Sequence, residues 1–338
     1  MAITTDVTYS TLQYIVKEAT EGLKRRHAFL DYADKFKGID IVEGGARIDV
    51  PVTVQDHSSI TYHSSGFEAT TDAVNTITQN ASYDWGFWSA PIAISLKEQA
   101  VNRGELAILD ILEERTKNAI DKMGRDLNSQ ILTNSLVVGT CGVQTLYGND
   151  AAAVGMLESV AKASQNNTVG GLSKSTYNVP GWTNAWASAS GAFSTNGLGA
   201  MNSIYTQIQS VHRGARPVDC IIASEASFRL YKGSLQANER YVDAKSLDAG
   251  RMDLMFAGAP IAPDLALTQS SWTGDDIFSM YFINFSGVRL KMLAGCDFAL
   301  KETGLVDGSI VNQFRLIFGG QLVGLHLGSL GVLSNANS

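Results

Sequence analysis

The side chains that most often do chemistry are few and scattered in this sequence. The five histidines lie far apart, and only His57 and His63 are close, six positions apart in a polar segment. Two histidines at this spacing could bind a metal ion across a hairpin, although solvated histidines in a turn are the simpler interpretation. Glu113 and Glu114 are adjacent carboxylates, but no Ser, Cys or His lies near them to complete an acid–base or nucleophilic site. These residues therefore predict neither a metal site nor a catalytic centre.

Motifs that hold nucleotides, nucleophiles or zinc are also missing. The sequence has no GxxxxGK(S/T), GxSxG or HExxH motif, and Gly197-Leu198-Gly199 is not followed by the third glycine of a dinucleotide-binding turn. Trp182 and Trp186 could stack on a base or a sugar, but burial against a neighbouring loop is the simpler interpretation. The three cysteines are widely spaced, which favours a reducing compartment over a disulfide framework. We expect no cofactor and no enzymatic activity.

The composition narrows the function further. The chain has 338 residues and a formal net charge of −7, and 17% of its residues are charged. A protein that grips nucleic acid over its whole surface is basic, so general nucleic-acid binding is disfavoured. No stretch provides the roughly 20 apolar residues that a membrane helix needs, and the first residues lack the basic and apolar regions of a signal peptide. We therefore expect no membrane contact.

The elements that would position any site include one unusually long helix. Between residues 102 and 133, apolar side chains recur every three or four positions, with Thr116 as the one polar member of the stripe. Asn102 and Glu105 form a variant of the capping box at its start. Two pairs of opposite charge stand four positions apart: Glu113 with Lys117, and Asp121 with Arg125. About 30 residues make a rod of roughly 45 Å with a single apolar stripe, which needs partners.

Residues 45–94 alternate between apolar and polar side chains, which indicates extended strands. Pro51 cannot donate to a strand ladder, so the first strand should have one unpaired side. The alternation in a second strand places three aromatic side chains on one face: Tyr83, Trp85 and Phe87. Residues 48–96 contain no Lys or Arg but five acids: Asp49, Asp56, Glu68, Asp72 and Asp84. The segment is either an ordinary solvated hairpin or a flap that lies on a neighbouring subunit.

The rest of the chain alternates between helices, low-charge loops and strands. Within residues 1–44, Ile15, Ala19 and Leu23 recur four apart, which favours an amphipathic surface helix over a nucleic-acid contact. Residues 136–200 are loop-rich and carry few charges. The patterns further along predict helices at 198–212 and 225–235, a buried strand at 218–223, a hairpin of 280–285 with 288–293 around Ser286-Gly287, and a tail strand over 310–333 that is broken at Gly319-Gly320.

Short motifs follow one another over nearly the whole chain. They are Tyr83-Asp84-Trp85, Pro91 to Ser95, Asp126-Leu127-Asn128, Cys141 to Leu146, Thr168 to Gly171 with Trp182, Pro217-Val218-Asp219, Glu239-Arg240-Tyr241, Gly258-Ala259-Pro260 with Asp264, and Met280 to Asn284. The order of these motifs, together with an N-terminal arm, a two-stranded excursion and a long helix, resembles the major capsid protein of tailed bacteriophages. Residues 147–167 have no counterpart in that pattern, and the C-terminus lacks the basic cluster often found there.

The resemblance implies an α+β fold, the tailed-phage capsid fold shared with encapsulins and herpesvirus capsid floors. It divides the chain into four parts: an N-terminal arm (1–44), an extended β loop (45–94), a peripheral domain with the long spine helix (95–214 and 291–338), and an axial domain (215–290). The arm and the extended loop would reach neighbouring subunits.

The resemblance also implies a structural function. Hexamers and pentamers of the chain would form an icosahedral shell, the virion capsid, assembled in the host cytoplasm around double-stranded DNA that is enclosed without sequence-specific binding. A portal is expected, and a separate scaffolding protein too, because residues 1–44 are too short to hold the cleavable scaffold domain of some family members. The alternatives are an encapsulin-type compartment that holds enzymes, and an unrecognised α+β enzyme.

The resemblance directs attention to contacts between subunits. In that family the extended loop lies over a neighbour's peripheral domain, so Glu68 and Asp72 near the loop tip are expected to meet basic side chains there. The candidate basic side chains of the subunit interface are Arg25, Arg26, Arg115, Lys117, Lys122 and Arg125.

Overall fold

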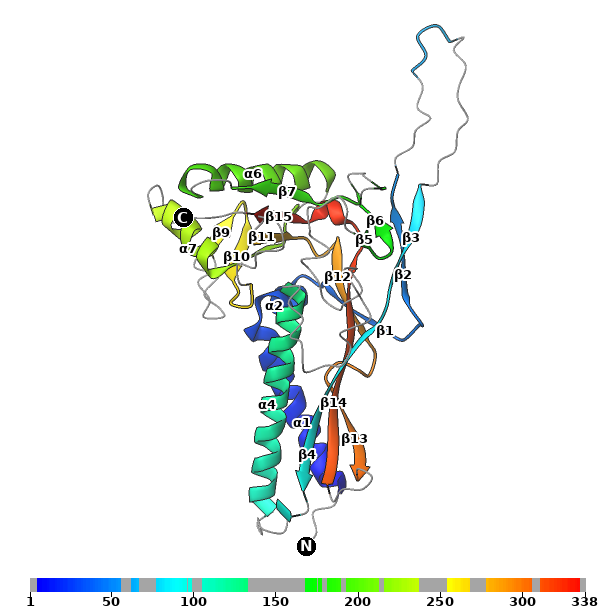
Figure 1. Ribbon diagram of the computed structural model, residues 1–338, viewed down its shortest axis with the longest axis vertical. Helices are drawn as coiled ribbons and strands as arrows, with labels where there is room; N and C mark the ends of the chain where they lie inside the picture. The colour runs from blue at the N-terminus through cyan, green and yellow to red at the C-terminus, as the bar shows by residue number, and fades with distance from the viewer. Residues whose placement is uncertain are drawn as a thin grey trace.

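The predicted long helix runs from Glu105 to Leu132 as α4 in the computed structural model (Figure 1). The structure describes residues 5–55, 62–66, 77–95, 97–98, 105–132, 168–174, 176–177, 181–189, 193–212, 216–236, 254–267, 278–305 and 311–334. The predicted stripe is the buried face of α4, since Ile120 and Leu127 are at most 1% exposed. Thr116 is buried with them and donates its hydroxyl to the Leu112 carbonyl at 2.7 Å, which satisfies its polar group. The proposed cap, Asn102, lies outside the described residues.

Two N-terminal helices precede the first strand: α1 (Thr5–Arg26) and α2 (Ala28–Lys35). The expected stripe on α1 is confirmed, because Ile15 and Leu23 are buried. α1 packs along α4 of the same chain (Figure 1). A side chain on Gly124 would bring its Cβ to 1.9 Å from Leu23 Cδ1, so the glycine permits the close approach of the two helices. In the single chain, therefore, the predicted arm lies on its own spine helix.

One sheet has five strands, with β14 at its centre. They are β1 (Ile39–Val42), β12 (Val288–Leu293), β14 (Val311–Gly324), β13 (Ala299–Leu305) and β4 (Gly86–Ser95). The expected break at Gly319-Gly320 is wrong, because β14 is continuous there and Gly319 pairs with Phe87. A Cβ at Gly319 would lie 2.9 Å from the Phe87 ring, so this glycine makes room for a ring across the ladder rather than a turn. The chain instead leaves the strand after Gly324 and forms the short helix η2 (Leu327–Ser329).

The other large sheet has six strands and carries two helices. In sheet order the strands are β7 (Ala185–Ser188), β15 (Gly331–Ser334), β11 (Phe278–Ile283), β8 (Cys220–Ala223), β10 (Ala259–Pro263) and β9 (Leu254–Phe256). The helices are α6 (Phe193–Val211) and α7 (Glu225–Gln236), which contact each other and pack against the sheet. Both predicted helices and the buried strand are confirmed, although α6 begins five residues earlier than expected.

The predicted hairpin around Ser286-Gly287 is wrong, although both of its strands exist. β11 belongs to the six-stranded sheet and β12 to the five-stranded sheet, so the chain crosses between sheets here. The Asn284 side chain fixes the crossing, because its amide donates to the carbonyls of Arg216 and Pro217 at 3.0 Å each. A Cβ on Gly287 would lie 1.7 Å from Ser329 Oγ, so the turn is packed against η2. The turn at Ser286-Gly287 therefore connects the two sheets instead of closing a hairpin.

A two-stranded ribbon, β2 (Ile48–Thr53) with β3 (Thr78–Tyr83), projects from the body (Figure 1). Pro51 lies in β2, whose other edge is unpaired in the described part of the chain, as predicted. The predicted aromatic alternation is wrong beyond Tyr83, because β3 ends there and β4 starts in another sheet with Trp88 buried and Phe87 51% exposed.

A short hairpin, β5 (Thr168–Val169) with β6 (Leu172–Ser173), holds the base of the ribbon. The Ser82 amide donates to the Gly170 carbonyl at 2.9 Å. The Tyr83 hydroxyl donates to the Gly324 carbonyl at 2.9 Å, and burial raises the pKa of this phenol. The ribbon base is thus tied both to the hairpin and to the end of β14.

Two expected domain boundaries do not follow the sheets. β4, which was expected within the extended loop, pairs over its whole length with β14 in the five-stranded sheet. β7 and β15 lie outside residues 215–290, yet both belong to the six-stranded sheet that holds the expected axial segment. The division into arm, loop and two domains stays a prediction; the sheets themselves combine strands from both sides of those boundaries.

Candidate assembly surfaces

The described residues offer little for catalysis. Among them there is no group of three or more His, Cys, Asp or Glu that could hold a metal ion. Within the same ranges, no helix has the length and apolar character needed to cross a membrane. Trp182 is fully buried, as expected, and its indole N–H donates to the Leu172 carbonyl at 3.4 Å, whereas Trp186 is 41% exposed. His57 lies outside the described residues, and His63 is exposed beyond the end of the ribbon.

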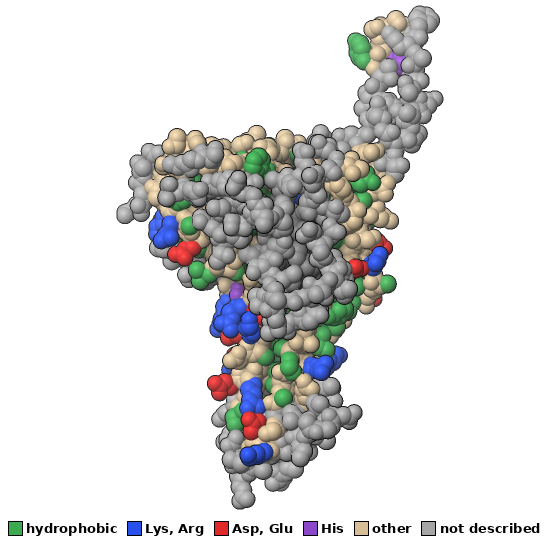
Figure 2. Space-filling model, viewed as in Figure 1, with side chains coloured by type: hydrophobic (Ala, Val, Ile, Leu, Met, Phe, Trp, Pro, Cys, Tyr) green, Lys and Arg blue, Asp and Glu red, His purple; other side chains and the backbone are tan. Residues whose placement is uncertain are grey.

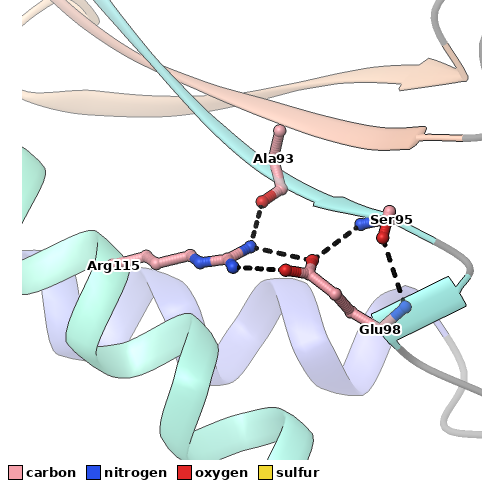
Figure 3. A network of polar contacts seen from close by, with 4 residues as sticks. All are labelled: Ala93, Ser95, Glu98 and Arg115. Carbon is pink, nitrogen blue, oxygen red and sulfur yellow. Dashed lines mark hydrogen bonds and ion pairs between the residues drawn. The ribbon is translucent and has the colours of Figure 1, made fainter. Parts of the chain in front are cut away.

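A polar network joins the end of β4 to α4 (Figure 3). The Ser95 amide donates to Glu98 Oε2 at 3.1 Å, and the Glu98 amide donates to Ser95 Oγ at 3.2 Å. Arg115 of α4 donates to both carboxylate oxygens of Glu98, at 2.7 and 3.2 Å, and to the Ala93 carbonyl at 2.6 Å. The planar guanidinium suits this forked arrangement, which fixes the chain where it leaves the sheet.

The same network sets the charge state of Glu98. Its hydrogen bonds from Arg115, and then from the Ser95 amide, lower the pKa of the Glu98 carboxyl to about 2. The pKa of Arg115 is raised in turn by the Glu98 carboxylate. Both groups therefore stay charged throughout the physiological range, and Arg115 makes three hydrogen bonds within its own chain.

A groove of about 820 Å³ lies between β4 and α4, next to this network. Its apolar members include the buried Trp88, Ile92 and Met123. The complete lining is Trp88, Ser89, Ala90, Pro91, Ile92, Ala93, Ile111, Glu114, Arg115, Asn118, Ala119, Lys122, Met123 and Asp126. Both signs of charge are present at its margin, and the lining has no nucleophile–base pair of a catalytic site.

Most of the other candidate cations have partners within the chain. Lys117 pairs with Glu113, as predicted, and this carboxylate raises the pKa of Lys117. Lys122 pairs with Asp126. The predicted pair of Asp121 with Arg125 is wrong, because Asp121 binds Arg26 of α1 at 3.0 Å. Sequence periodicity could not show this, because the competing partner is far away along the chain.

Several of the candidate cations are exposed on the surface, among them Arg125 and Arg25. Arg125 is exposed on α4 and makes no ion pair within the described residues, so it is the most available of the helix cations for a neighbour. Arg25 is exposed at the end of α1. A role of these residues between subunits stays a prediction.

The acidic partners expected near the loop tip, Glu68 and Asp72, lie outside the described residues. The segment 62–66 beyond the ribbon is described, and Tyr62 within it is 88% exposed. At the ribbon base, Asp84 pairs with Arg47 at 2.9 Å. One acid of residues 48–96 is thus neutralised by the arginine that comes just before this segment in the sequence.

Two motif residues that carried no predicted role link elements that are far apart in the sequence. The Asn128 amide at the end of α4 donates to both carboxylate oxygens of Asp264 at 3.1 Å, and both side chains are buried. Asp219 accepts the Phe285 amide at 2.9 Å, and burial raises the pKa of Asp219. Polar residues in otherwise apolar segments were the available signal, because buried polar groups need partners.

Comparison with known proteins identifies the fold. No protein-family model matches the chain, and no curated protein matches it. Among solved structures, the capsid of cyanophage A-1(L) has a TM-score of 0.62 at 14% identity, over 90% of this chain and 92% of that one. The capsid of a native GTA particle has a TM-score of 0.54 at 12% identity, over 90% of each chain. The holo-SrpI encapsulin complex from Synechococcus elongatus PCC 7942 has a TM-score of 0.54 at 11% identity, over 88% of this chain and 85% of that one.

These similarities extend over nearly the whole length of each chain. They confirm the expected α+β class and the predicted capsid fold, which this chain shares with phage capsids and an encapsulin. At such low identity they establish the fold, and the function must be argued separately.

Proposed function

Because the chain has the capsid fold from end to end, we propose that it is a structural protein that builds a shell from copies of itself. The observation that carries this proposal is the match to the cyanophage capsid, which covers 90% of this chain and 92% of that one. In the proposed shell, hexamers and pentamers form an icosahedral container around packaged double-stranded DNA. The net charge of −7 suits a container, because a basic inner wall would bind its genome tightly.

The projecting ribbon supports an assembled state. An isolated domain gains nothing from a two-stranded ribbon, β2 with β3, that projects from its body (Figure 1). It likewise gains nothing from the Tyr62 side chain, which is 88% exposed. A two-stranded ribbon is marginally stable by itself in water, so a surface to lie on would stabilise it. The proposal provides such a surface on a neighbouring copy.

The proposal includes further partners and a location. A separate scaffolding protein and a portal would be partners of the shell. The shell would be the virion capsid, assembled in the host cytoplasm, and the chain would act as a building block rather than as an enzyme.

Expression and electron microscopy test the proposal directly. The purified chain, alone or with the products of neighbouring genes, should form capsomers, sheets, tubes or closed shells in negative stain. A monodisperse monomer under both conditions, measured by light scattering, would refute the shell and favour the alternative of an α+β enzyme.

The encapsulin match supports one alternative container. The SrpI encapsulin shares the fold at a TM-score of 0.54, so a compartment that holds enzymes is the second candidate. The contents of the particles separate the two: nuclease-protected double-stranded DNA supports the capsid, and a co-purifying protein cargo without DNA supports the compartment. A terminase gene and a portal gene next to this one would agree with the first result.

A further inference from the structure

Helix α6 carries no charged side chain at all. From Ser175 to Val211 the sequence contains no Asp, Glu, Lys, Arg or His, and this stretch includes the whole helix. One face of α6 is buried against the six-stranded sheet through Met201, Ile204 and Ile208. The opposite face is exposed, yet its side chains are Ser, Thr, Asn, Gln, Gly and Leu. Figure 2 shows this upper edge of the molecule, where α6 lies in Figure 1, in tan and green without red or blue.

The neighbouring edge strand extends this uncharged surface. β7 pairs with β15 on one side, and on the other side the Gln207 side chain of α6 covers its backbone. The Gln207 carboxamide accepts the Trp186 amide at 3.4 Å and donates to the Trp186 carbonyl at 3.5 Å. The Trp186 side chain is 41% exposed beside α6. A partner would therefore meet side chains here, because the polar edge of the strand is already occupied.

Other exposed helix faces of this chain are different. α4 exposes Glu114 and Lys117, and α7 exposes Glu225 and Arg229. Exposed helix faces in soluble proteins normally carry such charges. The cores of protein interfaces are depleted of charge, because a charge buried without a partner is costly. The α6 face can lose its water without burying any charge.

We propose that the outer face of α6, together with Trp186, is a contact surface for a second copy of this chain. This inference rests on the proposed function, since a shell made of one protein must provide surfaces to its own copies. DNA does not fit the surface, because nothing on it can neutralise a phosphate. A charge on the facing surface of the second copy would be buried without a partner, so we expect that surface to be uncharged as well. Added salt should then neither weaken the contact nor restore it after a charge is introduced.

A pair of substitutions can add charge while keeping the helix intact. Asn202 and Thr206 are both exposed and stand four positions apart on α6. Asn202→Glu with Thr206→Lys places Glu one turn before Lys, an arrangement that supports a helix. The matched control, Asn202→Gln with Thr206→Gln, changes the same positions without charge. Gln209→Glu, on the next turn, is a second charged variant in case the first does not fold.

The experiment compares assembly of these variants with the parent chain. Circular dichroism checks the fold, and sedimentation measures the assembled fraction at low salt and at about 1 M salt, where the screening length falls to about 3 Å. We expect the charged variants to be folded, with the assembled fraction at least tenfold below the parent at both salt concentrations. The uncharged control should assemble like the parent.

The outcomes separate this inference from the function on which it rests. If the parent forms no assemblies, either alone or with the products of neighbouring genes, the proposed function fails. If the parent and the charged variants assemble equally, only the α6 contact is overturned. Recovery of the charged variants in high salt would also overturn it, because the face would then meet a charged surface. If the uncharged control folds but does not assemble, the argument that the added charge disrupts the contact is overturned.

Discussion

The contact between Gly124 of α4 and Leu23 of α1 gives a quantitative test of where the first helix lies. A Cβ on Gly124 would stand 1.9 Å from Leu23 Cδ1, although carbon atoms in contact prefer about 3.5–4.0 Å. Leu23 is 1% exposed and has no open space to enter. Gly124→Ala should therefore push the two helices apart, and overpacking of this kind costs about 1–3 kcal/mol.

The same substitution elsewhere in the helix pair provides a control. Gly22 is exposed on α1, and a Cβ there would meet nothing within 4 Å. Gly22→Ala should stabilise the subunit by about 1 kcal/mol, which is the difference in helix propensity between the two residues. Both substitutions share that gain, so the Gly124 variant should be about 1–3 kcal/mol less stable than the Gly22 variant.

Urea unfolding of the unassembled subunit, followed by circular dichroism, measures both variants. Adding Leu23→Ala to Gly124→Ala should relieve the clash. The double variant should therefore lose less stability than the sum of the losses of the two single variants, by about 1 kcal/mol or more. Equal stabilisation by Gly22→Ala and Gly124→Ala would refute the reasoning. In that case α1 would not lie on α4 of its own chain in solution.

Three other predictions concern the helix core, the polar network and the loop tip. Ile120 is fully buried, so Ile120→Asp should cost several kcal/mol and give insoluble protein; soluble, assembly-competent protein would show that the stripe is not core. The lowered pKa of Glu98 means that its contribution to stability is complete above pH 4.5 and is lost only as the pH falls toward about 2. Arg115→Gln should therefore lower the melting temperature equally at pH 5 and pH 8, and a loss confined to one of these pH values would contradict the assignment. Glu68→Lys with Asp72→Lys should leave a folded subunit that assembles poorly at low salt and better at high salt, because exposed charges are screened. Sedimentation at the two salt concentrations checks this last prediction, and normal shells at low salt would disprove the contact.

The periodicity of the sequence predicted which side of a helix or strand is buried, but it did not predict which element packs or pairs with it. The stripe from Leu112 to Ile131 is buried as expected, because every third or fourth position of a helix lies on one face whatever packs against it. The strands on either side of Ser286-Gly287 were also predicted, but their pairing was not. A turn signature is a local feature, whereas β11 and β12 are assigned to different sheets by partners from distant parts of the chain.

The candidate site shows the same limit. Arg115 was singled out from the sequence as an interface cation, but its bonds to Glu98 and Ala93 depend on how the chain turns between β4 and α4. Likewise, the partner of Asp121 is Arg26, on a helix far away in the sequence, and not Arg125 four positions on. The charges were visible in the sequence, but the geometry that pairs them was not.

The last described strands have a consequence for the timing of folding. β14 lies inside the five-stranded sheet, and β15 lies between β7 and β11 in the six-stranded sheet. Both are synthesised after all the other described strands, so neither sheet can close while the ribosome is still translating the preceding part of the chain. Pairings over such sequence distances are also slow to form. Under the proposed function, a nascent subunit could not present finished surfaces to other copies early, and assembly would follow the synthesis of β15.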